Sequence, residues 1–330
     1  MSQKAIFFQN EKILIIKDSV FTTESISPNS IDLIVTSPPY NVDIKYNSHD
    51  DRLSYEDYKE FSRDWMSRCY DWLKDDGRFC LNIPLDKNKG GKQSVGADLT
   101  CIAKEIGFKY HSTIIWNEGN ISRRTAWGSW SSASAPYIIA PVELIVVFYK
   151  KTWKKISGSK KSTIEPKDFQ DWTNGLWTFS GESKNKIGHP APFPVELPRR
   201  CIQLFSYEGD TVLDPFLGSG STLIASYLAG RKGIGIEIDK NYCEIALERL
   251  KKEVGVEPLL TKIDSVFQYF KGNPNRDISH TEVREWINTE YKEKTGSVIK
   301  HFDRKIRNLC ERGMLIRVRE GIYRYEPPFK

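Results

Sequence analysis

The most informative chemical pattern is a glycine turn that is followed, one strand later, by an acid. In DTVLDPFLGSGSTLIASYLAGRKGIGIEID (residues 210–239), the turn Gly218-Ser219-Gly220 separates a strand ending at Asp214 from a helix beginning near Thr222. Glycines let the backbone approach a ligand closely, and the free N–H groups of a helix start suit a carboxylate or a phosphate. Glu237, at the end of the next strand, is placed to accept hydrogen bonds from ribose hydroxyls. The pattern predicts a site for a nucleoside that carries a small anionic group.

Two common phosphate-binding patterns do not match this turn. No lysine follows the glycines, so the turn is not a P-loop for nucleoside triphosphates. The spacing is not GxGxxG either, which disfavours a dinucleotide. Taken alone, a GxG turn is equally consistent with an ordinary tight connection between a strand and a helix.

The second candidate element is the corner Ser37-Pro38-Pro39-Tyr40, which follows the apolar run DLIVT. Neither proline offers an N–H group and both fix φ, so the strand must end in a rigid corner beside an aromatic ring. Ligand sites of open parallel sheets lie outside the carboxyl ends of the strands. We therefore expect this corner and the end of TVLDPF (211–216) to be neighbours at the mouth of one cleft. In isolation, a strand-terminating turn with a half-buried tyrosine is the simpler interpretation.

Short apolar runs predict the elements that position these residues. Near-continuous Val, Ile and Leu runs are typical of strands buried on both faces, as in a parallel sheet covered by helices. Apolar residues three or four apart predict helices between several of the runs. Strands alternating with helices indicate a doubly wound α/β fold. The predicted strands are 13–17, 32–37, 78–83, 112–116, 143–149, 211–216 and 233–238, and the predicted helices are 55–73, 98–105, 194–205 and 241–252.

The composition is that of a soluble globular protein. The 330 residues are 39% hydrophobic and 28% charged, enough for one large α/β domain with a small one, or for two medium domains. The start MSQKAIFFQNEK is too short and polar for a signal peptide, and no apolar run could span a bilayer, so we expect a cytoplasmic protein without membrane association. Six scattered cysteines without a CxxC pair predict reduced thiols and no metal site. The net charge of +6 is compatible with a polyanionic partner.

Taken together, TSPPY (36–40), LDPFLGSGST (213–222) and GIGIEID (233–239) resemble the amino-methyltransferases of DNA whose catalytic motif precedes the cofactor motifs, the β order of that family. The resemblance covers about residues 5–252, and residues 188–222 match the cofactor half almost throughout. It implies S-adenosylmethionine as cofactor and double-stranded DNA as substrate. It also implies a circularly permuted methyltransferase sheet, in which the run 13–17 lies beside the run 233–238.

The resemblance assigns cofactor binding to residues around the glycine turn and to others far from it. The turn would cradle the methionine part, Glu237 would hold the ribose hydroxyls, and Asp18 would lie near the adenine. A segment before residue 194 would pack on the other side of the cofactor. Ser221 stands where the family often has threonine, and the hydroxyl is retained. The full set is Asp18, Thr36, His189, Pro190, Phe193, Asp214, Phe216, Gly218, Ser219, Gly220, Thr222 and Glu237.

The resemblance assigns catalysis to Ser37, Pro38, Pro39 and Tyr40. An exocyclic base amine is a poor nucleophile because its lone pair is delocalised into the ring. Ser37 Oγ and the Pro38 carbonyl would accept its two N–H bonds, while Tyr40 would stack on a base rotated out of the duplex. Cytosine C5 methylation would need a nucleophilic cysteine, typically after proline, and the sequence has no Pro-Cys pair.

Within the resembled family, serine in the first position of this motif is commoner in cytosine-N4 enzymes and aspartate in adenine-N6 enzymes. The resemblance therefore favours cytosine N4 as the methylated atom, with adenine N6 as the alternative. A DNA-binding regulator that keeps the fold without activity is the third interpretation. The expected setting is a prokaryotic, nucleoid-associated restriction-modification system, with a separately acting restriction endonuclease as candidate partner. The expected oligomeric state is a monomer or a homodimer.

Two basic segments that also contain aromatic residues separate the catalytic half from the cofactor half. Lysine and arginine near aromatic rings suit a phosphate backbone. The resembled family keeps its target-recognition region between these motifs, so the resemblance implies that residues 117–137 and 150–188 recognise the target. A solvated, lysine-rich loop is the simpler alternative. The residues expected to contact DNA are Arg123, Arg124, Lys154, Lys155, Lys160 and Lys161.

The last part of the chain differs in character. Ser279 and Glu282 form a capping box, a second helix is expected from Ser297, and LIRVREGIYRYEP reads as a β-hairpin. Helix, helix and hairpin in this order resemble a winged helix. We therefore divide the chain into a catalytic domain, 1–262, and a winged-helix-like module, 263–330, that binds DNA or serves in packing or dimerisation. The module has 14 Lys and Arg against 10 Asp and Glu, and its expected DNA-binding residues are Lys300, Arg304, Arg307, Arg317 and Arg319.

Overall fold

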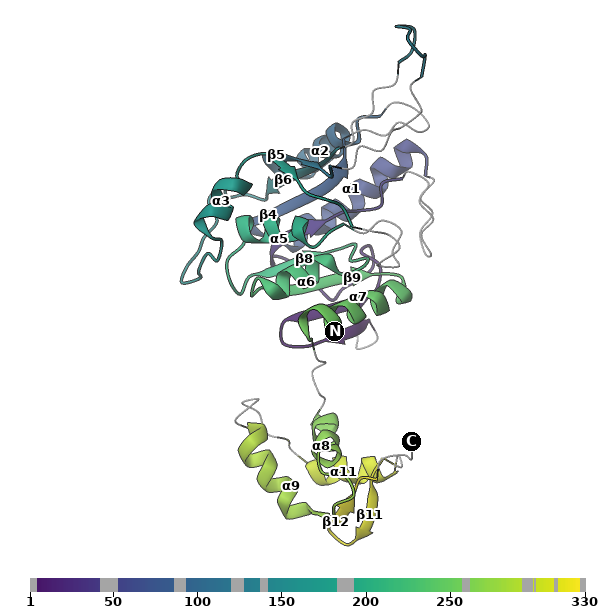
Figure 1. Ribbon diagram of the computed structural model, residues 1–330, viewed down its shortest axis with the longest axis vertical. Helices are drawn as coiled ribbons and strands as arrows, with labels where there is room; N and C mark the ends of the chain where they lie inside the picture. Colours follow the sequence, from purple (N-terminus) through teal and green to yellow (C-terminus); the bar gives the residue numbers. More distant parts are fainter. Residues whose placement is uncertain are drawn as a thin grey trace. The chain divides into compact units, whose positions relative to one another are not determined.

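The computed structural model describes residues 5–41, 53–85, 93–119, 128–136, 142–182, 193–256, 262–292, 299, 301–311 and 314–326. The chain forms two compact units, residues 1–257 and 258–330 (Figure 1). The boundary expected from the sequence, after residue 262, lies a few residues later. Within the described ranges, no helix combines the length and apolar character that crossing a bilayer requires.

The first unit is organised around one sheet, which has nine strands among the described residues, in the order β1-β2-β9-β8-β3-β4-β6-β5-β7. The five neighbours β2, β9, β8, β3 and β4 run parallel to one another. β6 is antiparallel to both β4 and β5, so its amino end lies at the edge where the parallel strands end. The strands are β1 (Ile6–Gln9), β2 (Ile13–Lys17), β3 (Ile31–Thr36), β4 (Leu73–Pro84), β5 (Lys109–Asn117), β6 (Val142–Tyr149), β7 (Leu176–Thr178), β8 (Thr211–Asp214) and β9 (Lys232–Glu237).

Helices cover both faces of this sheet (Figure 1). One core joins Trp65 of α1 and Leu99 of α2 to strand residues such as Phe79. On the other face, Ile202 of α5 and Leu250 of α7 belong to cores that also contain strand residues. All six residues of β3 are buried, as a strand with helices on both faces requires. The helices are α1 (Tyr55–Trp72), α2 (Val95–Ile106), α3 (Pro166–Trp172), α5 (Glu196–Phe205), α6 (Ser221–Leu228) and α7 (Lys240–Val254).

The structure confirms the α/β architecture with a mostly parallel sheet. The expected pairing of the first and last predicted strands is present, because Ile13 lies opposite Gly233 and Lys17 lies opposite Glu237. β4 begins five residues before its predicted start at residue 78, since Leu73 already pairs with Ile31. β1, β7 and α3 were not predicted; they have only four, three and seven residues, too few for an apolar period to stand out.

The second unit is small and has its own core, which includes Val266, Phe270 and Ile306. Ser279 Oγ accepts the backbone N–H of Glu282 at 3.1 Å, but the Glu282 carboxylate contacts Tyr269 and Arg276, so only half of the expected capping box forms. Its elements are α8 (Lys262–Lys271), β10 (Ile278–Ser279), α9 (His280–Trp286), a π-helical turn (Ile287–Tyr291), α11 (Phe302–Glu311), β11 (Ile316–Arg319) and β12 (Ile322–Arg324).

The predicted hairpin of the second unit is present. β11 and β12 pair antiparallel, and β10 adds to β12 to make a three-stranded sheet in the described part of this unit. The helix expected from Ser297 is α11, which begins at Phe302; residues 293–298 and 300 lie outside the described residues.

Candidate active site

A cavity of about 400 Å³ opens where the parallel strands of the first unit end. The corner after β3, the glycine loop after β8 and the end of β9 all contribute to its wall. The two candidate elements of the sequence analysis therefore share one site, although they are far apart in the chain. The predicted catalytic and cofactor-binding residues that line the cavity are Asp18, Ser37, Pro38, Pro39, Tyr40, Phe193, Phe216, Gly218, Ser219 and Glu237.

Asp214 joins the ends of β3 and β8 behind the cavity wall. Its two carboxylate oxygens accept hydrogen bonds from the hydroxyls of Thr36 at 2.8 Å and Thr222 at 2.7 Å, and Phe216 N donates to it at 3.1 Å. Complete burial raises the pKa of Asp214 to about 6. Four predicted cofactor-binding residues do not belong to the described lining of the cavity: Asp214, Thr36, Thr222 and Gly220. In the structure they support or form part of the glycine loop behind that lining.

The glycine loop is held in a conformation that requires glycine. Gly218 and Gly220 have φ values of +52° and +85°. A Cβ on Gly220 would lie 3.0 Å from Ala246 Cβ of α7, so α7 packs directly on the turn. From the same helix, the Arg249 guanidinium donates to Ser219 O at 2.9 Å. The loop is therefore fixed by α7, with its inner side facing the cavity.

Glu237 presents a buried carboxylate to the cavity. One oxygen accepts Gly218 N at 2.9 Å and the other accepts Asp239 N at 2.8 Å. Burial is the main cause that raises the pKa of Glu237 to about 7, and the charges of Asp239 and Asp214 add to it. Each oxygen of a carboxylate has a second lone pair, so the group can still accept hydroxyl donors of a ligand.

The predicted catalytic corner has two partners that the sequence analysis missed. The Tyr40 hydroxyl lies 2.6 Å from Ser37 Oγ and donates to Glu143 Oε2 at 3.1 Å. Asn82 Nδ2 of β4 donates to both the Tyr40 hydroxyl, at 2.9 Å, and Glu143 Oε2, at 2.6 Å. Burial raises the pKa of Glu143 to about 7, and the nearby Glu118 contributes.

Glu143 reaches this site because β6 is antiparallel to its two neighbours, β4 and β5. Its register places Glu143 opposite Pro84 at the carboxyl end of β4 and opposite Trp116 near the end of β5. An acid at the start of the run ELIVVFY was the available signal, but using it required knowing that the strand is antiparallel. Other lining residues that were not predicted from the sequence include Trp116, Glu118, Glu182, Asp239 and Tyr242.

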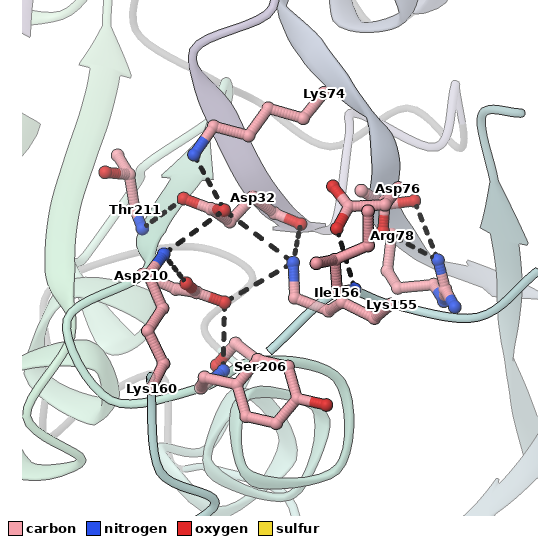
Figure 2. Close-up of polar contacts among 12 residues, drawn as sticks. Asp32, Lys74, Asp76, Arg78, Lys155, Ile156, Lys160, Ser206, Asp210 and Thr211 are labelled. Atoms are coloured by element: carbon pink, nitrogen blue, oxygen red, sulfur yellow. Dashed lines mark hydrogen bonds and ion pairs between the residues drawn. The ribbon is translucent and has the colours of Figure 1, made fainter. Parts of the chain in front are cut away.

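Lys155 and Lys160 form part of an ion-pair cluster (Figure 2). Lys155 Nζ lies 3.4 Å from Asp210 and 3.7 Å from Asp32, and Lys160 Nζ lies 2.5 Å from Asp210. Lys74 completes the cluster at 2.8 Å from Asp32. Burial alone would raise the pKa of Asp210, but the hydrogen bonds from Lys160 and from Tyr207 N, with the charge of Lys155, bring it below its usual value.

This cluster gives Lys155 and Lys160 carboxylate partners within the protein, and the expected contact of both lysines with DNA phosphates stays a prediction. Asp32 lies near the start of β3 and Asp210 immediately precedes β8, so the cluster lies at the amino ends of the strands, at the sheet edge opposite the cavity. The Lys155 side chain is only 10% exposed, and two carboxylates already neutralise its charge. Both lysines therefore fasten the segment after β6 to the sheet.

The remaining predicted DNA contacts divide into two groups. Lys154 and Lys161 are exposed on the first unit, and Arg304, Arg307, Arg317 and Arg319 are exposed on α11 and β11 of the second. Five predicted site residues lie outside the described residues. Two of them, His189 and Pro190, were predicted to contact the cofactor. The other three, Arg123, Arg124 and Lys300, were predicted to contact DNA.

Comparison with known families gives a match over most of the first unit. The family model described as DNA methylase (N6_N4_Mtase) matches residues 31–248. The Type II methyltransferase M.HpaI of Haemophilus parainfluenzae is 30% identical over 282 residues, which cover 82% of each chain. The Type II methyltransferase M.MjaVI of Methanocaldococcus jannaschii is 59% identical over 175 residues, which cover 53% of this chain and 89% of that protein.

Solved structures share the architecture. TTHA0409 of Thermus thermophilus, assigned to the DNA modification methylases and solved in complex with S-adenosyl-L-methionine, has a TM-score of 0.59 at 27% identity, over 76% of this chain and 97% of that one. The PvuII DNA methyltransferase, which is cytosine-N4-specific, has a TM-score of 0.56 at 21% identity, over 73% of this chain and 87% of that one, a likeness of fold.

Proposed function

The chain belongs to the DNA methylase family, and from this premise we propose that it transfers a methyl group from S-adenosyl-L-methionine to the exocyclic N4 amine of cytosine in double-stranded DNA. The observation that carries the proposal is the single cavity that both the Ser37–Tyr40 corner and the loop of Gly218 and Glu237 line. A base in contact with the corner and a cofactor in contact with the loop would lie side by side in it.

The residues on the cofactor side fit S-adenosyl-L-methionine. Glu237 retains acceptor capacity for the two ribose hydroxyls beside the two backbone N–H groups that it already binds. The loop at Gly218 and Ser219 would hold the methionine part, and Asp18 would lie on the adenine side. When bound, the cofactor supplies a methyl group activated by a sulfonium charge.

The residues on the base side fit an amine. Ser37 Oγ and the Pro38 carbonyl would accept the two N–H bonds and orient the nitrogen lone pair toward the activated methyl group. The Tyr40 ring lines the cavity, where it would stack on a base rotated out of the duplex. The buried carboxylates of Glu237 and Glu143 would also favour the positive charge of the reacting centre.

Cytosine N4 is our proposal for the methylated atom because serine occupies the first position of the corner. Adenine N6 is the second candidate, since the same acceptors would bind its amine. An inactive DNA-binding regulator is the third candidate. The Ser37–Tyr40 corner and the glycine loop disfavour it, because a protein without activity would not need to retain both motifs.

We also propose a setting and an arrangement for the whole chain. Relatives named Type II methyltransferases support a role in a restriction-modification system, in which a separate endonuclease cuts unmodified sites. The pairing of β2 with β9 supports a circularly permuted methyltransferase sheet. The order of elements in the second unit supports a winged-helix-like module that binds DNA through Arg304, Arg307, Arg317 and Arg319.

The test is nucleoside mass spectrometry of DNA incubated with the protein and with S-adenosyl-L-methionine labelled in its methyl group. We expect labelled N4-methylcytosine from the wild type and none from Ser37→Ala, which should still bind the cofactor. Labelled N6-methyladenine would keep the enzyme and overturn the base assignment. No label on several DNAs, despite cofactor binding, would favour the regulator.

A further inference from the structure

The Ser37 hydroxyl is the end of a hydrogen-bonded chain that runs to the half-buried carboxylate of Glu143. Ser37 Oγ lies 2.6 Å from the Tyr40 hydroxyl, and that hydroxyl lies 3.1 Å from Glu143 Oε2. Asn82 Nδ2 donates to both the Tyr40 hydroxyl and Glu143 Oε2. The Asn82 main-chain carbonyl, 3.4 Å from the Tyr40 hydroxyl, is a more distant acceptor.

When Glu143 is ionised, the donors in this chain have one favourable direction. A carboxylate only accepts, so the Tyr40 O–H donates to Glu143. The Tyr40 oxygen then accepts from Asn82 Nδ2, and at 2.6 Å it also accepts the Ser37 O–H. With its proton turned toward Tyr40, Ser37 Oγ offers lone pairs to the cavity. A hydroxyl in this state accepts a hydrogen bond from an amine.

When Glu143 is protonated, the chain can reverse. The carboxylic acid donates to the Tyr40 oxygen, the Tyr40 O–H turns to Ser37 Oγ, and the Ser37 proton is directed to the cavity. A hydroxyl that donates would suit a base carbonyl and would leave an amine without its acceptor. The ionisation of Glu143 therefore distinguishes the two kinds of base edge.

We propose that Glu143 is a positioning residue that acts through Tyr40 to make the Ser37 hydroxyl an acceptor, and that it thereby selects an amine over a carbonyl at the reacting position. The inference rests on the proposed function, because it deepens the role of the same corner. It adds a residue of β6 to a site otherwise described by the motifs after β3 and β8.

Several groups in the described structure set the pH at which Glu143 ionises and the Ser37 hydroxyl becomes an acceptor. Asn82 from β4 and Tyr40 from the corner stabilise the carboxylate by hydrogen bonds, whereas burial and the charge of Glu118 after β5 oppose it. Glu182, after β7, lines the same cavity. Because burial prevails, the pKa of Glu143 rises to about 7, so the acceptor state forms as the pH increases through neutrality.

The first test needs no activity. The protein is labelled with 13C at the tyrosine ring carbon bonded to oxygen, the Tyr40 signal is assigned from its loss in Tyr40→Phe, and the pH is varied from about 5 to about 9. We expect the Tyr40 signal to titrate near the pKa of Glu143, and Glu143→Gln to abolish that titration. Glu118→Gln should keep it and move it to lower pH, since a like charge is removed. A Tyr40 signal that is flat in the wild type, or that titrates unchanged in Glu143→Gln, would overturn the proposal.

The second test measures the rate of a single turnover on DNA with labelled cofactor. The wild-type rate should rise about tenfold per pH unit below the pKa and then reach a plateau, as expected for one ionising group. Glu143→Gln should be at least about tenfold below that plateau and without the pH dependence, and Glu143→Asp should recover part of both. Cofactor affinity should stay unchanged in each variant, which separates a positioning role from a damaged cavity. A wild-type pH profile in Glu143→Gln would overturn the proposal.

Selection is tested by binding to duplexes that carry the deaminated target base, in which a carbonyl replaces the amine. We expect the wild type to prefer the amine duplex by about tenfold or more at pH 8, and Glu143→Gln to lose most of that preference. Equal preference in both proteins would overturn the selective role. Failure of the wild type to methylate any DNA would instead refute the proposed function, and the tyrosine titration would still decide whether Glu143 governs the corner.

Discussion

At the residue scale, three carboxylates with raised pKa values define the site. The pKa of Asp214 is raised to about 6 and those of Glu143 and Glu237 to about 7, in each case mainly by burial. Burial without a cationic partner is costly for an ionised group. Of the three, Glu143 and Glu237 line the cavity, and Asp214 supports the glycine loop through Thr222.

Glu237 makes a testable contribution to stability. The pKa of Glu237 is raised to about 7 in the folded protein, whereas in the unfolded chain its carboxyl ionises near pH 4.5. Because the folded state disfavours the ionised form, the free energy of unfolding decreases as the pH rises from about 4.5 to about 7. Glu237→Gln removes this loss. We expect the difference in unfolding free energy, variant minus wild type, to increase by about 2 kcal/mol between about pH 5 and pH 8, in urea titrations without cofactor.

The control for this prediction is Glu244→Gln, which changes an exposed acid of α7. Its difference from the wild type should stay nearly constant over the same pH range. Glu237→Gln and Glu237→Ala should also weaken cofactor binding by at least about tenfold in calorimetry, since hydrogen bonds to a charged acceptor are lost. If the difference in unfolding free energy between Glu237→Gln and the wild type did not change with pH, ionisation of Glu237 would not destabilise the folded state.

At the element scale, the packing of α7 on the glycine loop determines the shape of the cofactor side. Gly220 combines φ of +85° with a Cβ position 3.0 Å from Ala246, whereas Gly209 has φ of +77° and open space around it. Gly209→Ala should therefore lower the free energy of unfolding by about 1 kcal/mol, because only the backbone is strained. Gly220→Ala should lower it clearly more, because the added methyl group also meets Ala246. Only Gly220→Ala should reduce cofactor affinity. Equal losses of stability in urea unfolding would show that α7 yields to the added methyl group.

The ion-pair cluster belongs to the same scale. Lys155→Met would remove a positive charge that neutralises the buried carboxylates of Asp32 and Asp210. We therefore expect the free energy of unfolding to fall by about 2 kcal/mol or more. The neighbouring, exposed Lys154→Met is the matched control and should change stability by less than about 0.5 kcal/mol. DNA affinity of folded Lys155→Met should equal that of the wild type. A selective loss of DNA affinity would instead support the phosphate-binding role that the sequence predicts for Lys155.

At the scale of the whole molecule, the chain separates the chemistry from a second compact unit. Every described residue that lines the cavity belongs to the first unit, and the exposed arginines of α11 and β11 belong to the second. If the second unit binds DNA, changing Arg304, Arg307, Arg317 and Arg319 together to glutamine should lower DNA affinity and reduce the dependence of log affinity on log salt by up to about 4.

Cofactor affinity should remain unchanged in this variant, because the cavity lies in the other unit. Arg276→Gln, which alters a basic residue of the second unit that already pairs with Glu282, is the control and should have little effect. An unchanged salt dependence together with an altered sedimentation coefficient would support dimerisation by the second unit.

The sequence by itself determined the parallel core, the two candidate motifs and their meeting in one cavity. These follow from local physics: buried strands are continuously apolar, prolines end a strand, and glycines permit positive φ at Gly218 and Gly220. The tertiary structure alone decided where individual charges lie. Lys155 and Lys160 resemble DNA-binding residues until their pairing with Asp32 and Asp210 is known. Glu143 resembles an ordinary strand residue until the antiparallel direction of β6 brings it to Tyr40, because a carboxylate acquires its role from its partners in space.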